Sequence, residues 1–231
     1  MEFPHDVLDA AGLNRQHVFD LAELPTEVRQ SLGDTGDFTQ LILIGHGGRR
    51  LWQQVQAEHL PGLHPIDDYS RQTVAAWFAA HLPGHRYKLL YPDHEHIVGL
   101  QALGELAGWH QPSPFMVGID AEWGSWFAYR ALLLADTRFL ASPRRVGPNP
   151  CTACAAKPCL DACPADALRP GFQLDRCLAY RRQPGSRCEN TCLARLACPV
   201  GAEHRYTAEQ MRHSYAISLA MIREFYREAA K

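Results

Sequence analysis

The first 140 residues switch between helical and extended hydrophobic patterns. In residues 3–32 apolar side chains recur at helical spacing, interrupted by Gly12 and Pro25, which predicts two short helices. Residues 38–46 read FTQLILIGH, a run of β-forming residues next to glycines, which predicts a buried strand. By the same criteria we expect strands at 86–91 and 125–134 and helices at 68–81 and 96–109. Alternating strands and helices predict a layered α+β domain.

A proline-rich segment, SPRRVGPNP at 142–150, marks the end of this domain. Residues 151–205 are rich in turn formers and too poor in large apolar side chains to form a core alone, so a metal centre would have to supply the missing stability. Residues 207–230 return to a helical pattern with an apolar face, which we expect to pack on the first domain. The predicted domains are therefore residues 1–142, 143–206 and 207–231.

Composition excludes several classes of protein. The 231 residues are 46% hydrophobic with a net charge of −2, which is typical of a folded globular chain. The longest apolar runs, such as 74–80, fall short of the roughly 18–20 residues that a membrane helix needs, and the N-terminal segment lacks the apolar core of a secretion signal. We expect a soluble, cytoplasmic protein with no membrane partner. Residues 144–206 carry ten Lys and Arg against five Asp and Glu, which suits nucleic acid or buried anionic metal–thiolate clusters.

All eight cysteines lie between Cys151 and Cys198, in two related groups. The first group reads Cys-x2-Cys-x4-Cys-x3-Cys-Pro, and the second ends in Cys-x3-Cys-x5-Cys-Pro. In bacterial ferredoxins three cysteines of such a run bind one cluster, and the cysteine before proline binds the other. The motif therefore predicts two 4Fe–4S clusters that exchange ligands: cluster one on Cys151, Cys154, Cys159 and Cys198, and cluster two on Cys163, Cys177, Cys188 and Cys192.

Structural zinc and disulfide bonds are the alternatives to iron–sulfur clusters. Zinc sites use Cys-x2-Cys pairs but rarely the Cys-Pro ending twice. Disulfide scaffolds are mostly secreted and cross-linked throughout. The x4 gap before Cys159 departs from the ferredoxin spacing, which affects the ligand assignment more than the presence of clusters. Arg181, Arg182 and Arg187 suit either the charge of buried clusters or a docking face for a partner.

The residues before the cysteines narrow the range of possible functions. The stretches 91–109 (YPDHEHIVGLQALGELAGW) and 124–136 (GSWFAYRALLLAD) resemble the core of epoxyqueuosine reductase. That family, like the reductive dehalogenases, pairs a corrinoid-binding nitroreductase-like domain with a two-cluster ferredoxin module. Residues 124–130, 64–71 and 41–46 are also similar to segments of the CblC cobalamin-processing proteins. The resemblance implies a nitroreductase-like or CblC-like domain, a bacterial-type ferredoxin module with two 4Fe–4S clusters, and a C-terminal helix.

The resemblance also implies a cofactor and a proton donor. Cobalamin would bind base-off and receive electrons from the clusters, with flavin as the less favoured occupant. Asp93 stands where the family carries an acid proposed as a proton donor, although an aspartate there is equally suited to cap the following helix. The residues that we expect to line the cofactor are Trp126, Phe127, Tyr129 and Arg130. The alternative is that the aromatic residues belong to the core and that Arg130 pairs with an internal acid.

Histidines offer two further sites. His94 and His96 would share one face of a strand, as a pair of metal ligands does, although polar residues at a strand end show the same pattern. His46, His64 or His110 could ligate cobalt from below, which base-off binding in the resembled families does not require.

The leading interpretation is an enzyme, an iron–sulfur oxidoreductase that binds a corrinoid and passes cluster electrons to it or to its substrate. The second is a ferredoxin-type electron-transfer protein without a corrinoid. The third is a tRNA modification enzyme like epoxyqueuosine reductase, which residues 107–115 (AGWHQPSPF) disfavour because they replace a segment of that family containing Gly-Lys-Asn. The expected partners are a corrinoid or small-molecule substrate and a redox protein, with tRNA disfavoured.

Overall fold

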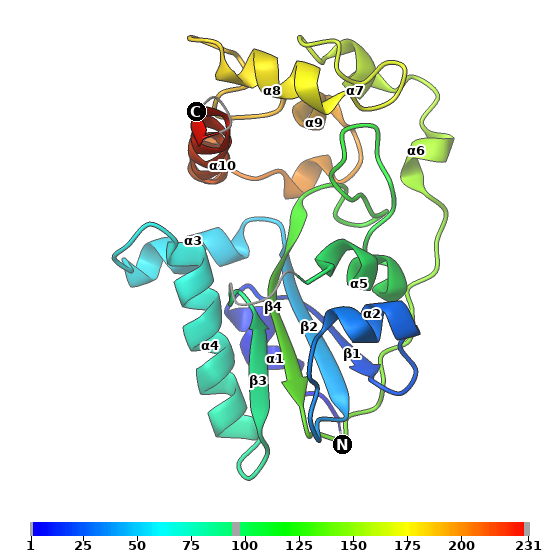
Figure 1. The fold of residues 1–231 in the computed structure, drawn as a ribbon, viewed down its shortest axis with the longest axis vertical. Helices are drawn as coiled ribbons and strands as arrows, with labels where there is room; N and C mark the ends of the chain where they lie inside the picture. The colour runs from blue at the N-terminus through cyan, green and yellow to red at the C-terminus, as the bar shows by residue number, and fades with distance from the viewer. Residues whose placement is uncertain (1, 94–97, 229–231) are drawn as a thin grey trace. The chain divides into compact units, whose positions relative to one another are not determined.

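The computed structural model describes residues 2–93 and 98–228 and divides the chain into two compact units (Figure 1). The first unit comprises the residues up to 110 together with 127–147, and the second comprises 111–126 together with the residues from 148 onward. Residues 111–126, which we expected in the first domain, belong to the second unit because Phe115 and Ile119 pack there against Leu168 and Ala194. Within the described ranges, no helix has the length and apolar character of a membrane span.

A four-stranded antiparallel sheet forms the centre of the first unit. Its strands are β1 (Arg15–Asp20), β2 (Gln40–Gly47), β3 (Tyr87–Tyr91) and β4 (Phe127–Ala135), in the order β1-β2-β4-β3. The central strand β2 is buried along its whole length, which explains its continuous apolar run. The three strands expected at 38–46, 86–91 and 125–134 are confirmed to within two residues.

The helical pattern predicted over residues 3–32 is wrong at Arg15–Asp20, which form the edge strand β1. This strand pairs along β2, from Arg15 opposite Gly45 to Asp20 opposite Gln40. The helical spacing of Val18 with later leucines is therefore incidental, because long-range pairing with a neighbouring strand overrides local periodicity.

The helices described in the first unit cover the sheet. They are α1 (His5–Ala10), α2 (Thr26–Ser31), α3 (Arg50–Glu58), α4 (Pro65–His81) and α5 (Leu100–Ala107). Helices α1, α3 and α4 pack into one apolar core with the sheet, whose buried members include Leu8, Leu51, Trp77, Ile42 and Leu133. Helix α4 begins three residues before its predicted start because Pro65 suits the first turn. The start predicted for the next helix, at His96, lies outside the described residues.

Short helices, loops and one long C-terminal helix build the second unit. They are α6 (Pro150–Ala153), α7 (Pro158–Asp161), α8 (Leu174–Arg182), α9 (Leu193–Ala197), the 3-10 turn η1 (Ala202–His204) and α10 (Ala208–Glu228). Helix α7 packs against α9, and α10 packs against α8. The C-terminal helix thus belongs to the second unit, whereas we expected it to pack on the first domain.

Two glycines allow a close approach between loops of the second unit. Gly124 and Gly201 both have positive φ, +57° and +62°. A Cβ atom on Gly201 would lie 2.5 Å from the Gly124 nitrogen, closer than real Cβ contacts come. The contact joins the loop 111–126 to the segment that follows Cys198.

Candidate functional site

The cysteines of the predicted first cluster come from three short helices. Cys151 lies in α6, Cys154 follows it, Cys159 lies in α7, and Cys198 follows α9. Burial raises the pKa of Cys151, and the neighbouring Cys198, Cys159 and Cys154 thiols raise it further. Cys159 and Cys198 share one buried cluster, which the packing of α7 on α9 creates. These thiols are therefore close enough to affect one another's ionisation.

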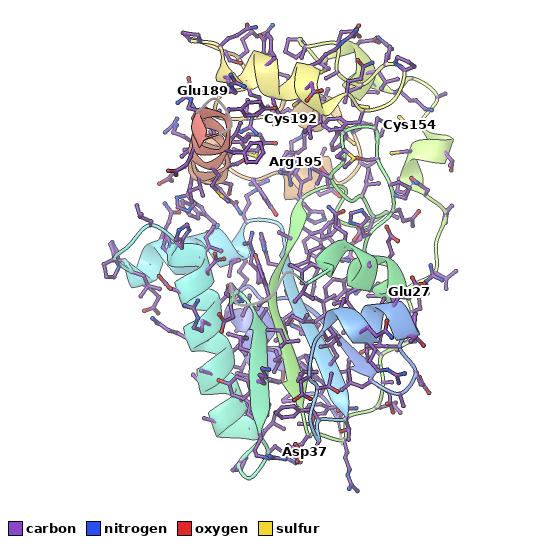
Figure 2. The ribbon with its side chains drawn as sticks, in the orientation of Figure 1. Glu27, Asp37, Cys154, Glu189, Cys192 and Arg195 are labelled. Carbon is purple, nitrogen blue, oxygen red and sulfur yellow. The ribbon has the colours of Figure 1, made fainter. Side chains whose placement is uncertain are left out.

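The cysteines of the predicted second cluster form a separate neighbourhood. Cys163 follows α7, Cys177 lies in α8, Cys188 lies in the loop after α8, and Cys192 caps α9. Burial raises the pKa of Cys177 to about 11, a shift to which the Cys192, Cys163 and Cys188 thiols add and which Arg181 opposes. Figure 2 labels one member of each set, Cys154 and Cys192, in this unit.

An apolar cavity adjoins the second set. Its volume is about 210 Å³, and all four cysteines of the set line it. The other lining side chains are mostly apolar and include Phe115, Leu168, Phe172, Leu178 and Tyr215. By the same measure a single water needs only roughly 10–15 Å³. The four sulfur donors therefore surround room for a group much larger than one ion.

Five thiols have a raised pKa and need a bound cationic group in order to ionise at neutral pH: Cys151, Cys159, Cys177, Cys188 and Cys198. Backbone N–H groups of Val200 and Leu193 donate to Cys198 and Cys188 and oppose the rise in their pKa values, but burial outweighs them. Metal binding would displace the thiol protons and stabilise this unit at the same time. All eight cysteines are free thiols. Within the part of the chain that the structure describes, no group of three or more His, Cys, Asp or Glu side chains is arranged to hold a single metal ion.

The predicted cofactor-lining residues divide between the two units. Trp126 belongs to the second unit, where it is fully buried and its ring centroid lies 5.4 Å from that of Tyr206. Phe127 and Tyr129 begin β4 in the first unit, with ring centroids 6.1 Å apart. Trp126 and Phe127 pack among protein side chains, whereas Tyr129 and Arg130 are half-buried. Their contact with a cofactor stays a prediction.

Polar partners fix Arg130 and Tyr129 in the first unit. The Arg130 Nε donates to His46 Nδ1 at 3.0 Å, and its Nη1 lies 3.9 Å from an oxygen of Asp67, which is the internal acid of the alternative interpretation. Because His46 Nδ1 accepts this hydrogen bond, its ring proton lies on Nε2. The Tyr129 hydroxyl lies 3.3 Å from His110 Nδ1, and burial lowers the pKa of His110.

Asp93 lies on the surface after β3. Its alternative role as the cap of the next helix is wrong, because Gly99 occupies the N-cap of α5. The role of Asp93 as a proton donor stays a prediction. Of the histidines considered as ligands, His64 caps α4, and the pair His94 and His96 lies outside the described residues.

A second cavity, of about 170 Å³, lies in the first unit, and among the described residues its lining includes none of the predicted cofactor-lining residues. Its lining includes His17, Leu24, Leu106 and Ser142. Burial lowers the pKa of His17 to about 4, and the charge of Arg145 contributes. This histidine is therefore neutral at physiological pH.

Solved structures share this arrangement at low sequence identity. A crystal structure of epoxyqueuosine reductase with an epoxyqueuosine-modified tRNA-Tyr stem loop matches with a TM-score of 0.57 and 13% identity, over 90% of this chain and 68% of that one. The enzyme from Bacillus subtilis matches with a TM-score of 0.55 and 15% identity, over 88% and 66%. The enzyme from Streptococcus thermophilus matches with a TM-score of 0.52 and 13% identity, over 84% and 64%. The fold is similar to that of epoxyqueuosine reductases.

At 13–15% identity these matches show a similar fold only. The chain spans slightly less than two thirds of the length of the Streptococcus and Bacillus enzymes. No protein-family model and no curated protein sequence matches it. A CblC protein from C. elegans matches with 12% identity and a TM-score of 0.44, over 86% of this chain and 83% of that one, which is too low to support an argument.

Two buried arginines are functional candidates that the sequence reasoning missed. The Arg15 guanidinium lies between the rings of Trp109 and Phe127, 4.6 and 4.5 Å from their centroids. Arg195 is 8% exposed and lies on α9. A signal for Arg195 was available, because it stands three residues from each of two cysteines assigned to different clusters.

Proposed function

We propose that this chain is an iron–sulfur oxidoreductase whose second unit holds two 4Fe–4S clusters in a ferredoxin-like module. The observation that carries the proposal is the cavity of about 210 Å³ lined by all four cysteines of the second set. Four thiolates in an apolar enclosure form the usual ligand shell of such a cluster. When bound, each cluster supplies one-electron transfer.

The ligand sets of the proposal follow the two thiol neighbourhoods. Cys151, Cys154, Cys159 and Cys198 would hold the first cluster, and Cys163, Cys177, Cys188 and Cys192 the second. The protein's own contribution is to exclude water around the sulfurs and to direct backbone N–H groups at two of them. Hydrogen bonds and burial are the means by which a protein adjusts the reduction potential of a cluster.

Metal analysis of anoxically purified protein tests this step. We expect roughly eight iron atoms and matching sulfide per chain. Cys163→Ser and Cys151→Ser form a matched pair, because each removes one ligand from a different set. Each variant should retain about half of the iron, and the double variant should retain almost none. Zinc in place of iron, or eight iron atoms in the Cys163→Ser variant, would contradict the proposal.

The first unit is proposed to bind a corrinoid that accepts the cluster electrons. The support is the fold, which is similar to that of epoxyqueuosine reductases, and the half-buried pair Tyr129 and Arg130. An aromatic ring and a guanidinium suit the flat, amide-bearing corrin ring. The contacts of Arg130 with His46 and Asp67 would hold the guanidinium in place. When bound, the corrinoid supplies a cobalt centre that cycles between oxidation states. A redox partner protein would deliver the electrons to the clusters.

Electron paramagnetic resonance tests corrinoid binding directly. Cob(II)alamin added to the anoxic protein should lose its axial-nitrogen splitting at one corrinoid per chain. Arg130→Gln should weaken this binding, whereas Lys88→Gln, which removes an exposed charge from β3 of the same unit, should leave it unchanged. An unchanged free-cobalamin spectrum beside reducible clusters would instead support an electron carrier or a flavin-dependent enzyme.

A second candidate function is the modification of tRNA. The observation that favours it is the match to epoxyqueuosine reductase, including the structure solved with a tRNA stem loop. Conversion of epoxyqueuosine to queuosine in a tRNA anticodon stem loop, measured under anoxic conditions with a chemical reductant, tests it. Failure of the chain to bind this stem loop even at low salt, where phosphate contacts are strongest, would exclude it.

A further inference from the structure

Arg195 is a buried cation whose partners are all neutral. It is 8% exposed. Its side chain donates to the hydroxyl and the backbone carbonyl of Ser125, and its guanidinium lies 4.4 Å from the Trp126 ring centroid and 5.0 Å from that of Tyr206. It also donates to the Tyr215 hydroxyl. These groups satisfy its hydrogen bonds, and the aromatic rings attract its charge, but none of its partners among the described residues is an anion.

The position of Arg195 relates it to both cysteine sets. Helix α9 is capped by Cys192 at its start and by Cys198 at its end, and Arg195 is three residues from each. Residues three apart along a helix are spatial neighbours. Figure 2 shows Arg195 together with Cys192 in this part of the unit. The two cysteines belong to different sets, so the guanidinium stands on a short helix that joins the two proposed clusters, as α7 also does through Cys159 and Cys163.

Tyr215 extends this contact to the cavity. It is a lining residue of the cavity that holds the second set, and its hydroxyl accepts from Arg195. The Cys192 thiol is close enough to act electrostatically on it. Arg181 stacks on the same ring, with its guanidinium 5.0 Å from the centroid. The cationic end of Arg195 is therefore linked to the wall of the second site.

A buried charge without a counter-charge is costly, so it points to an anion that completes the site. A 4Fe–4S core on four thiolates carries net negative charge. We propose that Arg195 is a positioning residue that holds positive charge between the two clusters and thereby sets their reduction potentials. This inference rests on the proposed function, because it requires both clusters. A nearby fixed cation favours the reduced, more negative form of a cluster, so loss of the charge should make reduction harder.

Potentiometric titration followed by electron paramagnetic resonance tests the role of Arg195. In Arg195→Gln we expect the ratio of reduced to oxidised cluster at a fixed potential to fall about tenfold for both clusters, which for one electron is a shift of ~59 mV to more negative potential. Arg195→Lys, which keeps the charge, should shift them less. Arg212→Gln is the control, because it removes an exposed charge of α10 that solvent screens.

Iron analysis distinguishes failure of the proposed function from failure of the proposed role of Arg195. If the wild-type chain takes up no iron–sulfur clusters, the proposed function fails. If clusters load and Arg195→Gln leaves both potentials where Arg212→Gln leaves them, the role of Arg195 is refuted and the clusters stand. Should Arg195→Gln not take up iron, Tyr215→Phe replaces it. Removing that hydroxyl should lower the ratio of reduced to oxidised second cluster at a fixed potential about threefold and leave the first cluster unchanged. Equal potentials in wild type and Tyr215→Phe would then overturn the proposal.

Discussion

Gly201→Ala tests the loop contact that encloses the cysteine-bearing unit. Gly201 has a φ of +62°, and a Cβ there would lie 2.5 Å from the Gly124 nitrogen and from the Trp123 carbonyl carbon. The left-handed backbone costs an alanine about 1–2 kcal/mol, and an extra carbon forced into packed structure costs about 1–3 kcal/mol. We therefore expect Gly201→Ala to lower the free energy of unfolding of the second unit by about 2–5 kcal/mol.

Gly185→Ala is the matched control. Gly185 has a φ of +71° in the same unit, but a Cβ there would meet no atom within 4 Å. Only the backbone cost of about 1–2 kcal/mol then remains. Urea unfolding of the anoxic full chain, followed by circular dichroism and by tryptophan fluorescence, to which Trp123 and Trp126 of the second unit contribute, gives the midpoint for each variant. Equal losses in the two variants would refute the reasoning, because their difference isolates the close contact.

Three further predictions concern the core, pH and the clusters. Leu133→Ala should lower the free energy of unfolding by about 2–5 kcal/mol, because Leu133 is fully buried in β4; a urea midpoint within error of wild type would contradict this. The pKa of His17 is about 4 in the folded chain and 6.5 in the unfolded chain. As pH falls from 6.5 to 4, His17 therefore binds a proton in the unfolded chain but not in the folded one, which favours unfolding. Stability should fall over this window by up to about 3 kcal/mol more in wild type than in His17→Gln, as urea midpoints at each pH would show. Removal of the clusters by an iron chelator should destabilise the second unit and leave the sheet of the first intact, and loss of both units together in circular dichroism would argue against separate stability.

Long apolar runs made three strands of the first unit predictable. The run from Leu41 to Ile44 has the composition of a strand buried on both faces, and it is one. Strand β1 was not predictable from local pattern, because its place depends on hydrogen bonds with β2 that short-range periodicity does not encode. Likewise Phe115 and Ile119 give no local sign that their partners, Leu168 and Ala194, lie about 50 or more residues further along the chain.

Some features of the candidate site were likewise predictable from local sequence, and others depend on the fold. Cysteine spacing limits which thiols can become neighbours, because the Cys-Pro turns and short helices are local. In the folded chain Cys151 has Cys154, Cys159 and Cys198 as neighbours, and Cys177 has Cys163, Cys188 and Cys192, while the assignment of these sets to clusters stays a prediction. The polar partners of Arg130 could not be predicted from the sequence, because His46 and Asp67 come from β2 and α4 and only the fold brings them to β4. Trp126 and Phe127, adjacent in sequence, fall in different units.

The chain passes between the two units three times, after residues 110, 126 and 147. A single cut therefore cannot release either unit whole. A fragment that starts at residue 148 keeps every cysteine but lacks Phe115 and Ile119 from its small core, and a fragment that ends at 110 lacks β4, one of the two inner strands of the sheet. During synthesis the loop 111–126 leaves the ribosome well before Leu168 and Ala194 exist to receive it. Any attempt to transplant the cysteine-bearing unit as an autonomous cassette must carry this loop with it, joined by a new connection.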